Sequence, residues 1–135
     1  MMMAVLLFST HDAIADEGSV SFGALQNAIL DGKSIGMTLD LSKCVIHDST
    51  EAGPPVKGSQ KFDAFMIQAD QTIAFSSMHF RLRSDRTPVQ EHFDFKVHPD
   101  GKIEVTCSFL NPVNLTVLQE ARFDCKIDDG AVFHW

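Results

Sequence analysis

Residues 93–105 read Phe-Asp-Phe-Lys-Val-His-Pro-Asp-Gly-Lys-Ile-Glu-Val. Apolar and polar side chains alternate on both sides of the Pro-Asp-Gly segment, which is typical of two strands joined by a tight turn whose glycine takes a positive φ. In the register that this turn sets, Phe95 lies opposite Val105 on one face and Lys96 lies opposite Glu104 on the other. Burial and charge pairing agree, so the stretch predicts an antiparallel β-hairpin.

A second hairpin is predicted directly before the first. Apolar and polar residues alternate over 78–83 and again over 92–97, after a turn at residues 85–88. Matching the apolar faces across this turn gives three facing pairs: Phe80 with Phe93 inside, and Arg81 with His92 and His79 with Asp94 outside. The sequence therefore predicts one polar outer face that carries His79, Arg81, Arg83, His92 and Asp94.

Elements on both sides extend the hairpins into a meander. Residues 22, 25, 28 and 29 are apolar at helical spacing, with Ser19 or Ser21 as N-cap and Asp31-Gly32 at the end. Alternation predicts strands at 35–41, 103–109, 113–117, 123–127 and 132–135, and one strand, or two broken near Asp70-Gln71, within 62–75. Residues 47–61 are rich in turn formers and predict one long exposed loop, either functional or simply mobile.

These elements predict a mainly β (α+β) fold. An N-terminal helix precedes an antiparallel meander that forms a curved sheet, a half-barrel or a sandwich.

The composition fits one domain and argues against several classes of protein. The 135 residues leave room for one core, and 44% of them are hydrophobic, including eleven Phe. Eleven Lys and Arg against 18 Asp and Glu give a net charge of -7, so nucleic acid is not an expected partner. No apolar run approaches the roughly 18 residues that cross a bilayer, so we expect no membrane span in the mature form. Walker and Rossmann patterns are absent from the sequence, which argues against nucleotide-dependent enzymes.

Residues 1–15 resemble a signal peptide. The apolar segment from Met1 to Phe8 precedes Ala13-Ile14-Ala15, which has the A-x-A form of a signal peptidase site. No Lys or Arg precedes Lys33, so the usual basic segment is missing. We expect cleavage before Asp16, a single domain at residues 16–135 and a periplasmic or secreted protein. The alternative is a buried N-terminal strand or a disordered tail.

Three cysteines allow one disulfide and one free thiol in an exported protein. Cys107 falls within a strand on the predicted buried face, where a free cysteine packs as a small hydrophobe. Cys44 and Cys125 lie near strand ends, and joining them closes a loop of about eighty residues, worth about 4 to 5 kcal/mol in the chain-entropy model. We favour this pair over the two other pairings; three reduced thiols are expected if the protein is not exported.

The six histidines show no H-x-H or H-E-x-x-H spacing and the cysteines no C-x-x-C spacing, so we expect no metal and no cofactor. His79 and Asp94 form the one candidate acid-base pair, but no nucleophile lies beside them, and a surface hydrogen bond is the commoner outcome. Arg81, Arg83 and Arg86 are suited to a carboxylate or phosphate, although a solvated face is the default.

Short segments in a particular order resemble the bacterial VirK family of small exported proteins, named after a virulence regulon. They are Ala28-Ile29-Leu30-Asp31-Gly32-Lys33, Leu39-Asp40-Leu41-Ser42-Lys43-Cys44, Phe75-Ser76-Ser77-Met78-His79-Phe80, Pro88-Val89-Gln90-Glu91, Val97-His98-Pro99-Asp100-Gly101, Cys125 and Gly130-Ala131-Val132-Phe133. The resemblance spans about residues 22 to 133. It implies an exported protein with a signal peptide, supports the pairing of Cys44 with Cys125, and supplies no catalytic residues.

These observations favour a non-enzymatic exported binding or interaction protein, associated with virulence through the family resemblance, with a protein or small molecule as its partner. The predicted outer face and the 47–61 loop are its candidate surfaces. One alternative is a carrier whose cavity is lined by Phe65, Phe80, Phe93 and Phe95, although a packed core is the commoner role for such residues. Another is a small hydrolase that uses His79 and Asp94.

Overall fold

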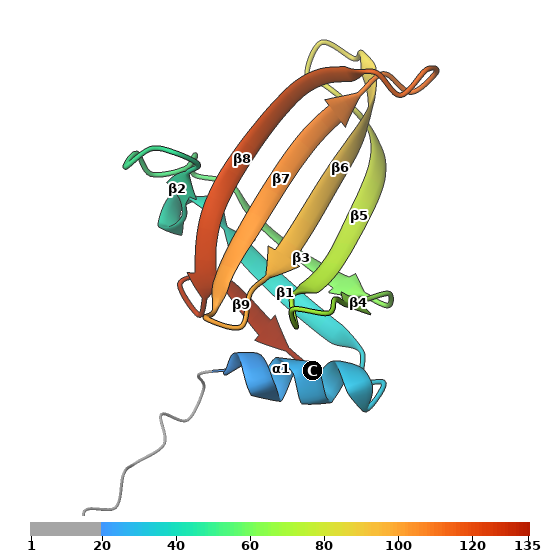
Figure 1. The fold of residues 1–135 in the computed structure, drawn as a ribbon. Coiled ribbons are helices and arrows are strands. Elements are labelled where there is room, and N and C mark those ends of the chain that lie inside the picture. Colours follow the sequence, from blue (N-terminus) through green and yellow to red (C-terminus); the bar gives the residue numbers. More distant parts are fainter. Residues whose placement is uncertain (1–19) are drawn as a thin grey trace, which may run out of the picture.

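A computed structural model describes residues 20–135, so the predicted signal peptide at residues 1–15 lies outside the described residues. The elements, shown in Figure 1, are α1 (Phe22–Leu30), β1 (Ile35–Asp40), a 3₁₀ turn (Leu41–Lys43), β2 (Val45–Ile46), β3 (Lys57–Phe62), β4 (Met66–Ile67), β5 (Ile73–Leu82), β6 (Pro88–Val97), β7 (Lys102–Leu110), β8 (Val117–Ile127) and β9 (Gly130–His134).

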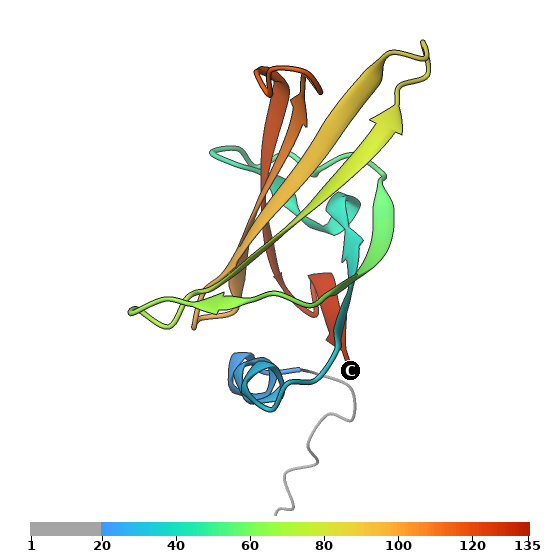
Figure 2. The ribbon, with the colours of Figure 1, turned by 90° about the vertical axis from the view of Figure 1, so that its right-hand side faces the viewer.

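Helix α1 has the caps that its sequence predicts. The Ser21 side chain accepts a hydrogen bond from the backbone N–H of Ala24, and the chain leaves the helix through Gly32, whose φ is 72°. Leu25 and Ala28 are buried. The helix lies across one end of the sheet and closes the core there (Figures 1 and 2).

The strands form one sheet in the order β3-β1-β9-β8-β7-β6-β5-β4, and β2 pairs with β8 off this path. Strands β4 to β8 are the predicted antiparallel meander. The chain then steps sideways at Asp128 and Gly130, both with positive φ, so that β9 pairs in parallel with the end of β8 and antiparallel with β1. The sheet curls strongly into a half-barrel, which confirms the predicted fold class (Figure 2).

The β6–β7 hairpin has the predicted register. Phe95 pairs with Val105, Lys96 pairs with Glu104, and Gly101 has a φ of 87°. The local turn and the alternation were therefore sufficient to determine this hairpin.

The prediction of a strand at 113–117 is wrong. Residues 111–116 form a loop, in which the Asn111 side chain accepts hydrogen bonds from the backbone N–H groups of Val113 and Asn114. Val113 is 92% exposed, and Leu115 has a φ of 58°. The Asn111 side chain stabilises a turn that competes with strand formation, so β8 begins only at Val117 and continues through the predicted strand at 123–127.

The prediction of one loop over 47–61 is wrong in its second half. Residues 57–61 belong to β3, which pairs with β1 from Ile35↔Phe62 to Asp40↔Lys57. Phe62 is the only buried side chain of β3, so backbone pairing makes this strand without an apolar alternation to signal it. The predicted break near Asp70-Gln71 is confirmed, because it separates β4 from β5.

The core fills the inside of the curl. Its centre is aromatic: the rings of Phe75 and Phe95 stack at 4.9 Å, and Phe62 contacts both of them edge-on. The predicted Cys44–Cys125 disulfide is present and joins residues 81 apart in sequence, while Cys107 is free and half-buried.

Candidate functional site

The pairing of β5 with β6 differs from the prediction by three residues. His79 pairs with Glu91 and Arg81 with Val89, instead of with Asp94 and His92. The strands continue to Leu82 and Pro88, and the turn is held by Asp85, whose carboxylate accepts a hydrogen bond from the backbone N–H of Thr87. The predicted register was wrong because it assumed that Met78, Phe80 and Leu82 face the core.

The core is instead reached by the odd-numbered residues of β5. Ile73 and Phe75 are buried, and the strict alternation of the strand places His79 and Arg81 on the same inner, concave face. Met78, Phe80 and Leu82 therefore lie on the outer, convex face and are 50 to 65% exposed. The signal was present in the sequence, because Ile73 and Phe75 have the opposite parity to the three exposed residues.

The five predicted site residues are thus divided between two faces. His79 and Arg81 lie on the inner face, whereas His92 and Asp94 lie on the outer face, opposite Met78 and Ser76. Arg83 follows β5, and its guanidinium lies 5.2 Å from the centre of the Phe109 ring. The prediction that these residues share one outer face is wrong; their role in binding stays a prediction.

An ion pair between an exposed arginine and a buried carboxylate lies on the inner face of this hairpin. Arg81 Nη1 donates to Glu91 Oε2 over 2.8 Å, and the Glu91 side chain is only 10% exposed. The Arg81 side chain is 56% exposed. A guanidinium has five N–H donors, and only one hydrogen bond of Arg81 is present among the described residues, so most of its donors remain available to a ligand.

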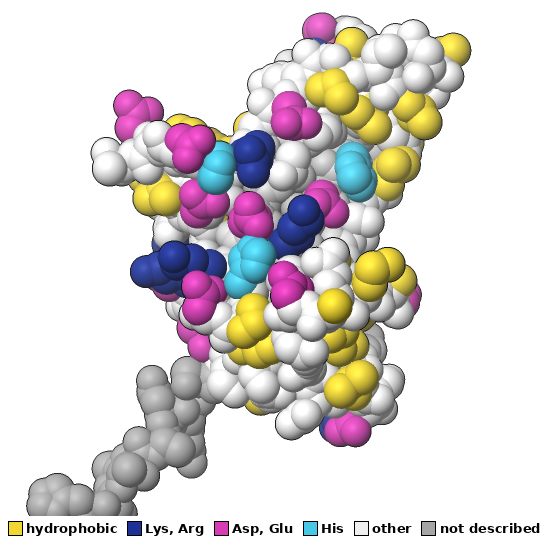
Figure 3. Space-filling view, in the orientation of Figure 1, with side chains coloured by type: hydrophobic (Ala, Val, Ile, Leu, Met, Phe, Trp, Pro, Cys, Tyr) yellow, Lys and Arg dark blue, Asp and Glu magenta, His cyan; other side chains and the backbone are white. Residues whose placement is uncertain are grey.

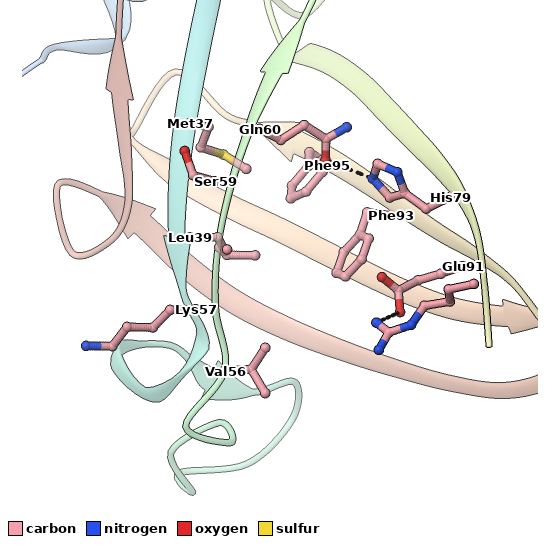
Figure 4. A pocket seen from close by; sticks show the side chains of 12 residues that line it. Met37, Leu39, Val56, Lys57, Ser59, Gln60, His79, Glu91, Phe93 and Phe95 are labelled. Atoms are coloured by element: carbon pink, nitrogen blue, oxygen red, sulfur yellow. Dashed lines mark hydrogen bonds and ion pairs between the residues drawn. The ribbon is translucent and has the colours of Figure 1, made fainter. Parts of the chain in front are cut away.

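A groove lies between this hairpin and the other half of the sheet (Figure 4). Its volume is about 240 Å³, its floor is made by the apolar side chains of Met37, Leu39, Phe93 and Phe95, and β3 forms the opposite wall. His79 and Gln60 meet across it at 3.2 Å, from Nε2 to Oε1. The groove thus combines an apolar floor with polar groups along its rim, an arrangement typical of a binding site.

The cavity proposed for a carrier does not form. Phe95 is 2% exposed within the core, Phe65 packs against Phe62 and Phe75, and Phe80 is 65% exposed on the outer face. Of the four predicted residues, only Phe93 and Phe95 line the groove. The commoner role, a packed core, holds for Phe65 and Phe95.

The hydrolase alternative loses its predicted pair, because Asp94 faces Ser76 and Thr106 instead of His79. A different chain of polar groups lies at the end of the β6–β7 hairpin: Thr72 Oγ1 is 3.3 Å from His98 Nδ1, and His98 Nε2 is 2.6 Å from Glu104 Oε2. The order of hydroxyl, imidazole and carboxylate is that of a catalytic triad. The would-be nucleophile, Thr72, is however buried, with only 1% of its surface exposed. The arrangement is suited to stabilising the hairpin rather than to attacking a substrate.

The face of the sheet that Figure 3 shows carries acidic, basic and histidine side chains intermixed. Glu104 also pairs with Arg122 at 3.7 Å, and the hydrogen bond from His98 lowers the pKa of the Glu104 carboxyl below its ordinary value. His47 contacts Asp124 at 3.0 Å on the neighbouring strand. Positive and negative side chains alternate in this cluster, so it forms neither a basic nor an acidic patch.

Cys107 lies on the inner face, paired with Phe93 and Ala121. Burial, with the charge of Glu91 as a second cause, raises the pKa of its thiol to about 11. The thiol therefore stays protonated at neutral pH, which makes it a poor nucleophile and a poor metal ligand. Within residues 20–135, no three His, Cys, Asp or Glu side chains gather into a metal-binding group. The same part of the chain contains no helix with the length and apolarity to cross a bilayer.

Comparison with known proteins places the chain among similar sequences and structures. The family model described as VirK protein matches residues 19–115. An uncharacterised protein from Sinorhizobium fredii is 30% identical over 131 residues, which cover 95% of this chain and 90% of that protein. An uncharacterised protein from Rhizobium radiobacter is 27% identical over 110 residues, or 81% and 76% of the two chains. The crystal structure of a VirK family protein from Legionella pneumophila has the same fold, with a TM-score of 0.74 at 24% identity over 85% of this chain and 96% of that one.

Proposed function

Because this chain belongs to the VirK family, which suggests no catalytic residues, we propose that it is a non-enzymatic exported binding protein whose binding site is the groove between β3 and the β5–β6 hairpin. We extend to it the association with virulence that the family name carries. One observation carries the choice of site: Arg81 uses one N–H for Glu91 and presents the rest of its guanidinium above an apolar floor.

The chemistry of the groove favours a partner with an apolar body and an anionic group. The apolar part covers the half-buried ring of Phe93 on the floor of the groove, and the anion binds the free donors of Arg81 without breaking its bond to Glu91. Arg83 adds a second cation near the same face. A carrier of a purely apolar ligand fits less well, because the groove is small and open.

Anilinonaphthalene sulfonate tests the site, because it joins an apolar ring system to an anion. We expect it to shift the amide resonances of Gln60, His79 and Glu91 in a two-dimensional NMR titration and to leave those of Glu104 and Asp124 unchanged. We expect Arg81→Gln to weaken the binding of the dye. Arg122→Gln, the matched change of a half-exposed arginine on the outer face, should leave the binding of the dye unchanged. Shifts confined to the outer face, or no shifts at all, would overturn the proposal.

Export is supported by the Cys44–Cys125 disulfide, because such bonds persist in oxidising compartments. The mass of the protein recovered from the extracytoplasmic fraction tests it. A mass that begins at Asp16, with two further thiols released on reduction, is expected. A full-length cytosolic product with three free thiols would refute export.

A further inference from the structure

We propose that the free edge of β5 takes up an extended segment of a partner protein by strand addition, and that this segment alternates apolar and acidic side chains. The inference rests on the proposed function, since the acidic side chains of the partner bind the same free donors of Arg81 at the rim of the groove. It follows from four observations: an unpaired strand edge, an exposed apolar stripe, free cationic donors and an uneven distribution of charge.

Strand β5 is an edge strand over most of its length. Its only partner on this side, β4, pairs with Ile73 and Ala74, so the edge from Phe75 to Leu82 is unpaired among the described residues. Residues 78–82 are exposed on both faces. Native edges are usually blocked by proline, lysine, a bulge or an inward-pointing charge; this stretch has no proline, lysine or bulge, and its one charged residue, Arg81, is paired with Glu91. An unpaired edge of this kind offers backbone N–H and C=O groups to an incoming strand.

The space beside this edge is open. Strands β3 and β5 meet at the Phe62 and Phe75 rings, 4.6 Å apart, and diverge from there, as Figures 1 and 4 show. Between the diverging strands lies the groove, where Gln60 and His79 form the one hydrogen bond between β3 and β5. A strand added to β5 therefore lies along the rim of the groove.

The outer face of β5 determines which side chains suit every second residue of the added strand. Met78, Phe80 and Leu82 form an exposed apolar stripe at every second position. A residue on an added strand lies beside its neighbour on the same face, and apolar neighbours of this kind stabilise a sheet. We therefore expect apolar residues at alternate positions of the partner, so that this stripe is covered.

The inner face of β5 determines which side chains suit the intervening residues of the added strand. The intervening residues of the added strand point toward His79 and Arg81, above the groove. Arg81 has free N–H donors, and a carboxylate is the side chain that binds a guanidinium best. Acidic residues between the apolar ones complete the alternation.

Charge favours a partner segment over a second copy of this chain. Strands β3 and β5 and the turn after β5 carry five of the 11 Lys and Arg but one of the 18 Asp and Glu. The five are Lys57, Lys61, Arg81, Arg83 and Arg86, and the acid is Asp85. Asp40 and Glu91 neutralise two of them, which leaves a net charge of +2 (5 − 1 − 2) on a chain of -7. Pairing two β5 edges would bring these cations together.

The test uses a labelled peptide of alternating valine and glutamate, seven residues long, titrated against the protein at low salt by fluorescence anisotropy. We expect saturable binding, and at least tenfold weaker binding of the matched valine and lysine peptide. Two further peptides carry N-methyl groups on all valines or on all glutamates. Since alternate residues of a strand point their N–H groups to opposite edges, at least one of these two peptides must fail to bind.

Two pairs of variants locate the peptide. Phe80→Ser and Leu30→Ser each remove a large exposed apolar side chain, the first from β5 and the second from α1. We expect only Phe80→Ser to weaken the binding of the peptide, by about tenfold. Arg81→Gln should also weaken the binding of the peptide, and Arg122→Gln should not. Phe80→Ser leaves the dye affinity of the groove unchanged, because Phe80 does not line it.

Three results would overturn strand addition: both methylated peptides bind like the parent, Phe80→Ser has no effect, or the free protein sediments as a dimer that Phe80→Ser dissociates. If the dye binds in the groove and the peptide does not bind, the proposed function stands and strand addition is rejected. If neither binds, both proposals are rejected.

Discussion

Arg81 and Glu91 form a diagonal pair across the β5–β6 hairpin, with Nη1 2.8 Å from Oε2, although their direct cross-strand neighbours are Val89 and His79. The pair joins a half-exposed arginine to a buried carboxylate at the wall of the groove. It links the stability of the hairpin to the chemistry of the proposed site.

Arg81→Met is expected to lower the free energy of unfolding by about 1–3 kcal/mol, because it leaves the Glu91 carboxylate buried without its partner. Adding Glu91→Leu restores part of the loss. Urea denaturation of the single and double variants measures both effects. Arg122→Met, whose partner Glu104 is 38% exposed, serves as the control and costs less than about 0.5 kcal/mol. An equal cost for the two arginines contradicts the assignment of Glu91 as the buried partner.

Phe80→Ala and Phe95→Ala separate the observed register from the register that the sequence predicted. Phe80 is exposed, so its replacement changes the free energy of unfolding by less than about 0.5 kcal/mol. Phe95 lies within the aromatic core, so its replacement costs about 3–5 kcal/mol. Thermal denaturation of both variants gives the comparison. A large loss for Phe80→Ala shows instead that Phe80 faces the core.

Replacing both Cys44 and Cys125 with alanine is expected to cost about 4 to 5 kcal/mol, because the bond closes a long loop. Chemical denaturation of the oxidised protein and the double variant measures it, with Cys107→Ala as the control. Gly130→Ala is expected to destabilise the oxidised protein as well, since Gly130 has a φ of 109° and an added Cβ would lie 2.6 Å from Cys44 Sγ. An unchanged midpoint in the double variant contradicts a stabilising disulfide.

The His98–Glu104 pair predicts a dependence of stability on pH. Hydrogen bonding from His98 lowers the pKa of Glu104 below its ordinary 4.5, so the unfolded state binds a proton at higher pH than the folded state does. The stabilisation is therefore complete above pH 4.5 and is lost as the pH falls through the lowered pKa. Glu104→Gln should be less stable than the wild type at pH 7 and approach it under acid conditions. Parallel stability profiles between pH 7 and pH 3 contradict this linkage.

Cys107 is expected to react slowly with iodoacetamide at pH 8 in the folded protein. With a pKa of about 11, against 9.0 for an unperturbed thiol, its thiolate fraction is lower by about a hundredfold. Mass spectrometry of the folded and denatured protein over time gives the two rates. The rate in the folded state should rise about tenfold for each pH unit up to pH 10. Fast labelling at neutral pH contradicts a protonated, half-buried thiol.

Local signals in the sequence determined much of the fold. The caps of α1, the register of the β6–β7 hairpin and the break at Asp70-Gln71 depend on residues that are close together in the chain. The pairing of Cys44 with Cys125 followed from their places near strand ends and from the family resemblance. The caps, the hairpin register and the break are confirmed because their energy comes from residues close together in the chain, whereas the disulfide joins residues 81 apart.

The sequence of β5 carries two conflicting signals, and the tertiary structure decided which face of the strand meets the core. Met78, Phe80 and Leu82 have the pattern of buried residues, but the parity of Ile73 and Phe75 places His79 and Arg81 inside. A regular strand cannot change face without a bulge, so burial at one end determines the face of the other end. The same holds for β3, whose polar side chains give no periodic signal and whose strand exists through backbone pairing to β1. The candidate groove, which depends on both strands, was therefore not visible in the sequence.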